Sequence, residues 1–148
     1  MFKSINGGKL PERATKYSAG FDVFSNEDIM IIGAGQTAMI GLGIAIDEQS
    51  EIYQELYKSD LLNSYYVELH PRSSTFLKGL ICNIGVIDMD FVSLEIKLIV
   101  HNSTQELFVV NKGDKIGQLI IKRHEGLLLP LEYTKNNIRV GGTGSTGK

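Results

Sequence analysis

The stretch GLICNIGVI, residues 79–87, places apolar side chains at the short spacing that is typical of β-strands and interrupts them with Gly and Asn. The same pattern recurs in seven further stretches: GFDVF (20–24), DIMIIGAG (28–35), QTAMIGLGIAI (36–46), YYVEL (65–69), LEIKLIVHN (94–102), QELFVV (105–110) and IGQLIIKR (116–123). Regular turn signals and few helical patterns accompany them. The sequence therefore predicts an all-β domain, folded as a closed barrel or a jelly-roll-like sandwich rather than as a parallel α/β domain.

One segment, DEQSEIYQELYKSDLLNS (47–64), breaks the β pattern. Ile52 and Leu56 are four residues apart, as are Tyr53 and Tyr57, with charged residues between them. This spacing predicts an amphipathic helix inserted between two strands. A helix that covers the barrel surface is one interpretation, and a lid over a ligand is the other.

Composition limits the classes of function. The 148 residues suit one domain, and 17 acidic against 15 basic residues argue against a broad nucleic-acid-binding surface. Any anionic ligand must then be met by a local group of cations. The single cysteine, Cys82, excludes an internal disulfide and favours a reducing compartment. With no apolar signal segment at the start and no run of about 18 apolar residues, we expect a soluble protein without membrane contact, in the cytoplasm or, for a viral protein, the host cytosol.

The motif HPRSS (70–74) combines an Arg and two hydroxyl side chains directly after a proline, which halts strand pairing. We expect these groups on a turn or at the start of a short helix, where they suit a phosphate. A helix cap beside a surface Arg would give the same pattern.

The motif NIGVIDMDF (83–91) carries Asp88 and Asp90 two residues apart, hence on one face of a regular strand. Acidic residues are unusual in a strand rich in Val and Ile. They indicate either a simple turn or a general base with its polar support.

The last eleven residues, IRVGGTGSTGK (138–148), contain four glycines, three hydroxyl side chains and Arg139. A glycine-rich terminus without apolar anchors is typically a frayed end. Backbone N–H groups, hydroxyls and an Arg are also the groups that wrap a phosphate chain. Both interpretations are open from these residues alone.

Together these segments resemble the homotrimeric dUTPases, whose five motifs they match in order. The matching segments are SAGFDV (18–23), HPRSS (70–74), GVIDMDF (85–91), GDKIGQLI (113–120) and RVGGTGSTG (139–147). The resemblance runs from residue 18 to residue 147 and leaves only the helix-like insert outside it.

The resemblance implies an all-β homotrimer with each active site built from three chains at a subunit interface. It implies cleavage of dUTP to dUMP and pyrophosphate with Mg²⁺, which limits uracil in DNA and supplies dUMP, and no direct contact with nucleic acid. Residues 1–137 would form the β domain. Residues 138–148 would form a flexible arm that closes over the active site when substrate binds.

By resemblance, Asp88 is the catalytic base that orients and deprotonates the attacking water. Asp22 contacts the metal indirectly through water, and the ion is held mainly by the substrate phosphates. This suits attack on a phosphate, which needs a base for the water and positive charge for the phosphate oxygens.

The resemblance also implies residues that contact the phosphates: Arg72, Ser73, Ser74 and Gln118 of the β domain, and Arg139, Gly144, Ser145 and Thr146 of the arm from a neighbouring chain. Arg72 would serve either the phosphate site or the subunit interface.

Uracil recognition is implied for the main chain of a hairpin spanning residues 79–88, with Asn83, Gly85, Val86 and Ile87 in the base pocket. A main-chain donor and acceptor match uracil and reject the reversed pattern of cytosine. Phe91 would lie against the deoxyribose and leave no room for a 2′-hydroxyl.

Three departures from the family pattern stand out. Phe91 replaces the usual Tyr and keeps the ring without the hydroxyl. Thr143 replaces the Phe that stacks on uracil, a contact worth about 0.5–1.5 kcal/mol beyond its area burial. The segment DFVSLEIK (90–97) is one residue longer than the family pattern, which predicts a bulge or a longer turn.

Two other functions are alternatives to a dUTPase. The dCTP deaminases share this fold, but their catalytic Glu would fall at Ile99, three residues before Asn102, and an isoleucine cannot carry a proton. A binding or regulatory protein could instead use the insert as a docking surface for a protein partner, through exposed Tyr53, Tyr57 and Leu61.

Overall fold

The computed structural model describes residues 1–125, which form eleven strands and three short helices. The strands are β1 (Phe2–Ser4), β2 (Phe21–Phe24), β3 (Ile29–Ile32), β4 (Thr37–Gly41), β5 (Ile44–Ile46), β6 (Tyr65–Pro71), β7 (Leu80–Cys82), β8 (Gly85–Asp88), β9 (Lys97–Asn102), β10 (Phe108–Asn111) and β11 (Lys115–Arg123). The helices are α1 (Glu51–Lys58), the 3₁₀ helix η1 (Leu62–Ser64) and α2 (Ser73–Leu77). The predicted all-β fold is confirmed.

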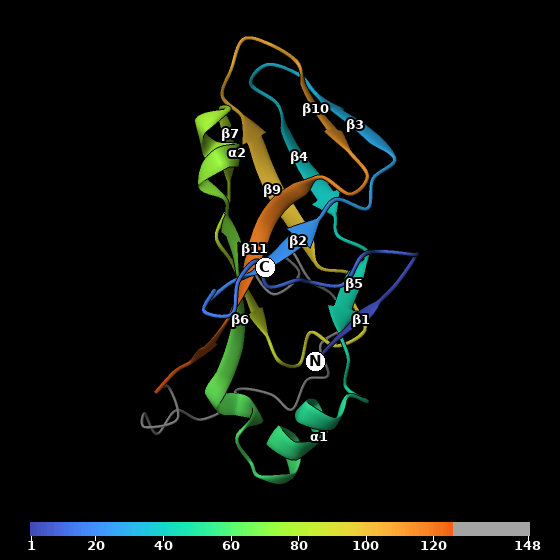
Figure 1. The fold of residues 1–148 in the computed structure, drawn as a ribbon, viewed down its shortest axis with the longest axis vertical. Coiled ribbons are helices and arrows are strands. Elements are labelled where there is room, and N and C mark those ends of the chain that lie inside the picture. Colours follow the sequence, from blue (N-terminus) through green and yellow to red (C-terminus); the bar gives the residue numbers. More distant parts are fainter. Residues whose placement is uncertain (126–148) are drawn as a thin grey trace, which may run out of the picture.

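The strands pair antiparallel in four sheets (Figure 1). The largest has the order β2-β11-β6-β8, and a second has the order β4-β9-β7. Two strand pairs, β1-β5 and β10-β3, complete the set. Strands far apart in sequence are thus neighbours, as in a jelly-roll-like sandwich.

The core lies between these sheets and follows the alternation of the strands. Along β9, Leu98 and Val100 point inward and are almost fully buried. Asn102 continues this inward row as a fully buried polar residue, and its amide donates to the carbonyl oxygens of Ile32 and Glu106 at 2.9 and 2.8 Å. A buried amide is stable here because its donors are satisfied.

The predicted insert at residues 47–64 forms α1 and η1, at the lower end of the molecule in Figure 1. Tyr53 is buried, and its hydroxyl donates to the Met89 carbonyl oxygen at 3.2 Å. The expectation that Tyr53 is exposed for docking was therefore wrong, because this residue anchors the helix to the turn after β8. Tyr57 and Leu61 are exposed as expected.

Residues 79–88 do not form the expected hairpin. β7 pairs with β9, whereas β8 pairs with β6 in a different sheet. The Asn83 backbone N–H still donates to the Ile99 carbonyl oxygen, and the chain then crosses to the other sheet. The crossing opens a space between the sheets that a paired hairpin would close.

The chain turns after Asp88, in the region where the sequence predicts a bulge or a longer turn. The Phe91 N–H donates to the Asp88 carbonyl oxygen at 3.0 Å, and Val92 forms a bridge to Ile46. Ser93 has a φ of 59°, in the left-handed region that non-glycine residues rarely adopt. This turn is therefore held against β5.

Of the helices in residues 1–125, none combines the length and the apolar character needed to cross a membrane.

Candidate active site

The residues expected to bind phosphate come together at one end of the largest sheet. Arg72 directly follows β6, and Ser73 and Ser74 open α2 with exposed side chains. Gln118 on β11 pairs with His70 on β6 and with Asp22 on β2. Three motifs that are up to about 100 residues apart in sequence thus meet on neighbouring strands.

Asp22 is the charged centre of this group, with a side chain only 13% exposed. Its Oδ2 lies 2.9 Å from Lys115 Nζ and its Oδ1 lies 3.4 Å from Arg72 Nε. Arg72 Nη1 also donates to the Lys115 carbonyl oxygen at 3.1 Å. The carboxylate therefore holds two cations side by side. Sequence reasoning missed Lys115, although it lies within the quoted motif GDKIGQLI.

A hollow of about 250 Å³ lies beside these cations. Its lining includes Arg72, Ser74, Thr75, Lys78, Asp114 and Lys115. Three cations thus face one carboxylate, and the hydroxyls of Ser74 and Thr75 add donors. The balance favours an anion.

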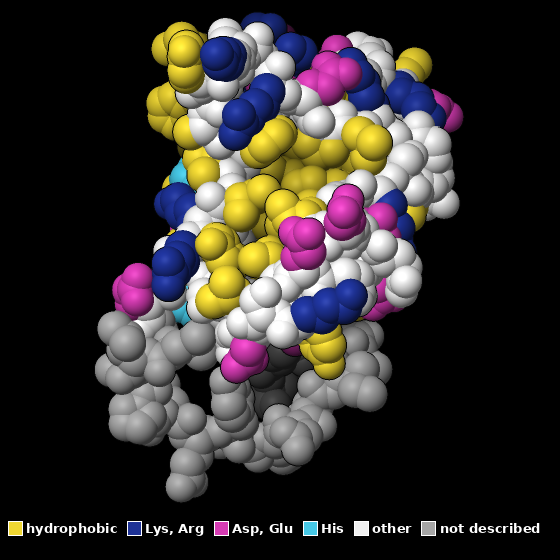
Figure 2. All heavy atoms as spheres, turned by 60° about the horizontal axis from the view of Figure 1, so that its bottom comes forward, with side chains coloured by type: hydrophobic (Ala, Val, Ile, Leu, Met, Phe, Trp, Pro, Cys, Tyr) yellow, Lys and Arg dark blue, Asp and Glu magenta, His cyan; other side chains and the backbone are white. Residues whose placement is uncertain are grey.

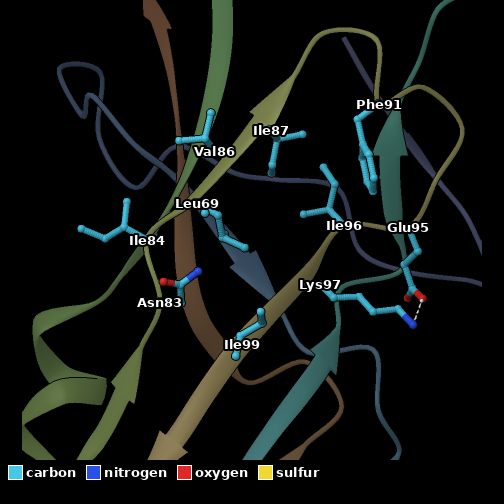
Figure 3. A pocket seen from close by; sticks show the side chains of 11 residues that line it. Leu69, Asn83, Ile84, Val86, Ile87, Phe91, Glu95, Ile96, Lys97 and Ile99 are labelled. Atoms are coloured by element: carbon cyan, nitrogen blue, oxygen red, sulfur yellow. Dashed lines mark ion pairs between the residues drawn. The ribbon is translucent and has the colours of Figure 1, made fainter. Parts of the chain in front are cut away.

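The residues expected to contact uracil and the deoxyribose line a second hollow of about 310 Å³ between β8 and β9 (Figure 3). All five contribute to its wall: Asn83, Gly85, Val86, Ile87 and Phe91. The other lining residues are Leu69, Ile84, Glu95, Ile96, Lys97 and Ile99. The wall is mostly apolar with one ion pair, Lys97 to Glu95 at 3.7 Å, which suits a planar base or a sugar.

The space-filling view shows hydrophobic side chains gathered in a hollowed face, with basic and acidic side chains around it (Figure 2). Exposed apolar residues near the second hollow include Ile81, Ile84 and Val86, the last of them 62% exposed. Such a concentration of exposed apolar surface is typical of a ligand or subunit contact.

Strand β8 is the last strand of its sheet in the described part of the chain. One edge of the β8 backbone pairs with β6, and the other edge of β8 presents main-chain donors and acceptors. Main-chain recognition of a base is therefore feasible along Gly85–Ile87, although by an edge strand and not by a hairpin.

Asp88 is exposed at the end of β8, directly opposite Tyr66 on β6. Arg72 follows β6 six residues after Tyr66. At about 3.3 Å per residue along a strand, Asp88 and Arg72 are about 20 Å apart within one chain. Asp88 and Arg72 of one chain are therefore too far apart to contact the same phosphate. Two different chains would have to supply them.

The donor set of residues 1–125 includes no cluster of three or more His, Cys, Asp or Glu side chains suited to a metal. Asp22 and Asp88 are therefore single carboxylates and do not belong to a preformed metal site within residues 1–125. Mg²⁺ is commonly bound in this way, by one or two carboxylates together with substrate phosphates and retained waters. A single carboxylate such as Asp22 is compatible with a Mg²⁺ ion that is held mainly by phosphate oxygens.

A second charged group, also missed from the sequence, lies on β6 and β11. Glu68 Oε2 lies 2.6 Å from both Lys122 Nζ and His70 Nε2, and Tyr66 donates to Glu68 Oε1 at 2.9 Å. The hydrogen bonds from Lys122 and His70 lower the pKa of Glu68 to about 2. Glu68 therefore stays ionised over the physiological range and ties the two strands together.

Cys82 is buried, and burial raises the pKa of its thiol to about 11. It is therefore protonated at neutral pH and unsuited to nucleophilic chemistry. Ile99, which occupies the position of the deaminase Glu, lines the second hollow with an apolar side chain. Neither residue provides an alternative catalytic group.

Five expected site residues lie outside the described residues, together with the proposed arm 138–148: Arg139, Thr143, Gly144, Ser145 and Thr146.

A sequence model of the dUTPase family matches residues 6–147. The chain is 37% identical to deoxyuridine 5'-triphosphate nucleotidohydrolase of Rickettsia felis over 146 residues, covering 95% of this chain and 89% of the relative. It is 32% identical to the protein of the same name of Paramecium bursaria Chlorella virus 1 over 150 residues, covering 98% and 94%.

Solved structures agree on the fold. The dUTPase from phage phi11 of S. aureus superposes with a TM-score of 0.71 at 18% identity, covering 95% of this chain and 98% of that one. The dUTPase from Streptococcus mutans superposes with a TM-score of 0.67 at 24% identity, covering 82% and 94%. With the family model spanning nearly the whole sequence and relatives above 30% identity, the chain belongs to the dUTPase family.

Proposed function

We propose that this chain is a dUTP diphosphatase, which hydrolyses dUTP to dUMP and pyrophosphate. The observation that carries this function is that the chain provides two different hollows, which copies of the chain would contribute to a shared site. One is apolar and lined by the residues expected at the base and sugar, and the other is lined by Arg72, Lys115 and Ser74. A base pocket and a polyphosphate pocket are what a nucleoside triphosphate requires.

In the proposed reaction a water oxygen attacks the α-phosphorus and the bond to the bridging oxygen toward the β-phosphorus breaks. Asp88 accepts the proton of the water, and pyrophosphate leaves. Asp88 suits this role because it lies exposed at a strand end, held in place by the turn that Phe91 closes on its carbonyl oxygen.

The base is proposed to lie against Asn83, Gly85, Val86 and Ile87. Phe91 is half-buried in the wall of the same hollow, where its ring would meet C2′ of the sugar. A steric wall at that carbon excludes the extra hydroxyl of UTP, and this exclusion does not need the hydroxyl that Tyr would carry.

The phosphates are proposed to contact Arg72, Ser73, Ser74 and Gln118. Gln118 Nε2 donates to the Pro71 carbonyl oxygen at 3.3 Å, which fixes the amide beside the start of α2. Mg²⁺ supplies positive charge to the phosphate oxygens when bound. Asp22 would reach it through water, since each carboxylate oxygen accepts more than the one contact it makes to a cation here.

We further propose that the active form is a homotrimer. The separation of about 20 Å between Asp88 and Arg72 supports an assembly of more than one copy, because a second copy is needed to bring a base to the phosphates, and the number three follows from the family resemblance. In the same proposal residues 138–148 act as an arm from a third chain, with Arg139, Thr143, Gly144, Ser145 and Thr146 closing over the substrate. The enzyme would work in the cytoplasm, or in the host cytosol for a virus.

The decisive experiment is a turnover assay on dUTP, dTTP, dCTP and UTP with Mg²⁺, measured by pyrophosphate release. Hydrolysis of dUTP alone is expected. Equal rates on all four nucleotides would contradict the pocket assignment, ammonia release from dCTP would indicate a deaminase, and no turnover of any nucleotide would overturn the proposed activity.

A further inference from the structure

We propose that Lys115 is a second phosphate-binding cation of the active site, positioned beside Arg72 by Asp22. The inference rests on the proposed function and adds a residue that the family resemblance did not assign. It is carried by a strand irregularity, a shared ion pair and the lining of the smaller hollow.

The strand irregularity decides where Lys115 points. Lys115 and Gln118 are three residues apart on β11, so a regular strand would place them on opposite faces. The register to β2 shifts between them: Lys115 pairs with Phe24, and Gly117 already pairs with the next residue, Val23. Two residues on β11 thus match one step on β2, which defines a β-bulge.

The bulge moves Lys115 to the face of Gln118. Phe24 and Asp22 are two residues apart on β2 and therefore share a face. Their partners Lys115 and Gln118 must share it as well. The bulge interrupts the hydrogen-bonded pairing of β11 with β2. In return it places the ammonium group of Lys115 on the phosphate side of the sheet.

The ion pair then fixes the position of this ammonium group. Asp22 is largely buried and bridges Lys115 Nζ at 2.9 Å and Arg72 Nε at 3.4 Å. The two cations repel one another, and the carboxylate between them offsets this repulsion. Arg72 Nη1 also holds the Lys115 carbonyl oxygen, so the backbone and the side chain of Lys115 are both tied to Arg72.

Lys115 keeps donors for a ligand. Its side chain is 43% exposed, and an ammonium group has three N–H donors, of which Asp22 receives one. It lines the hollow of about 250 Å³ with Arg72 and Ser74. A triphosphate with Mg²⁺ still carries excess negative charge, and Lys115 supplies a cation that Arg72 alone does not.

The test compares Lys115→Met, which removes the charge and keeps the length, with Lys115→Arg, which keeps the charge. Lys112→Met is the matched control, because Lys112 pairs only at 3.7 Å with Asp28, a side chain that is 94% exposed. The probes are dUMP and the non-hydrolysable α,β-imido analogue of dUTP, with affinities measured by calorimetry and kcat and KM measured on dUTP.

Lys115→Met is expected to bind the imido analogue about tenfold or more weakly, the size of one charge-assisted hydrogen bond, and to bind dUMP as the wild type does. Lys115→Arg should restore most of the affinity for the analogue, and Lys112→Met should leave it unchanged. An equal loss for both probes, or a lower melting temperature with unchanged affinities, would assign Lys115 a purely structural role and overturn the inference. Failure of the wild type to hydrolyse dUTP would count against the proposed function instead.

Discussion

At the scale of single residues, Asp88 and Phe91 carry the most specific expectations. Asp88→Asn keeps the shape of the side chain and removes its basicity. The variant is expected to bind the imido analogue of dUTP normally and to hydrolyse dUTP at least ~10²-fold more slowly, the contribution typical of a general base. Single-turnover rates measure the chemical step directly. Turnover at the wild-type rate would remove Asp88 from the catalytic role.

Phe91→Ala tests the sugar wall of the larger hollow. Because the ring is proposed to meet C2′, its removal should raise the ratio of kcat/KM for UTP over that for dUTP by about tenfold or more. Phe91→Tyr is the matched variant and should retain the wild-type ratio. A ratio that stays constant while stability falls would mean that Phe91 serves only packing.

At the scale of elements, the charged group centred on Glu68 links β6 to β11. The pKa of the Glu68 carboxyl is lowered from 4.5 to about 2. Ionised Glu68 therefore stabilises the fold above pH 4.5, and this contribution is lost as the pH falls toward 2. Glu68→Gln should therefore show a weaker dependence of unfolding free energy on pH in that window than the wild type. Urea titrations across this range measure it. The exposed Glu55 on α1, changed to Gln, should behave as the wild type, and a steep loss retained in Glu68→Gln would assign the acid sensitivity to other carboxylates.

The second element is α1, which Tyr53 fastens to the chain after β8. Burial, with the Glu48 and Asp90 carboxylates nearby, raises the pKa of the Tyr53 hydroxyl, which therefore stays protonated and donates to Met89. Tyr53→Phe should lower the free energy of unfolding by about 1 kcal/mol, since it removes one hydrogen bond to a buried carbonyl. Tyr57→Phe, at a position that is 67% exposed, should have no effect. Equal effects of the two changes would mean that the helix is not anchored through Tyr53.

At the scale of the whole molecule, the distance between the two groups of site residues predicts complementation. Homo-oligomers of Asp88→Asn and of Arg72→Met should each be nearly inactive. When the two variants are unfolded and refolded together, sites that take Asp88 from one variant and Arg72 from the other are intact. About a quarter of the wild-type activity is expected for random mixing, since each of two positions is filled correctly half the time.

Light scattering on the same mixture should show the mass of a trimer. Refolding each variant alone at the same total concentration is the control. An inactive mixture of correctly assembled trimers would contradict a site shared between chains, and an active monomer would contradict the proposed assembly.

The sequence alone determined the strand content, the helical insert and the order of the five motifs. These are local properties: alternation of apolar residues, turn residues and helical spacing act over a few neighbours in the chain. It also identified some of the residues that line the two hollows, such as Val86 and Phe91 in one and Arg72 and Ser74 in the other, because these residues belong to the motifs. The sequence alone did not predict the burial of Tyr53, because its hydrogen-bond partner Met89 is 36 residues away in the chain.

The tertiary structure decided what depends on strand pairing. It placed β7 and β8 in different sheets, and it moved Lys115 to the face of Gln118 through a bulge that no spacing rule indicates. It also set Asp88 and Arg72 about 20 Å apart, a separation that follows from which strand lies beside which. Register between distant strands is fixed by the packing of the whole core, and no short stretch of sequence contains it.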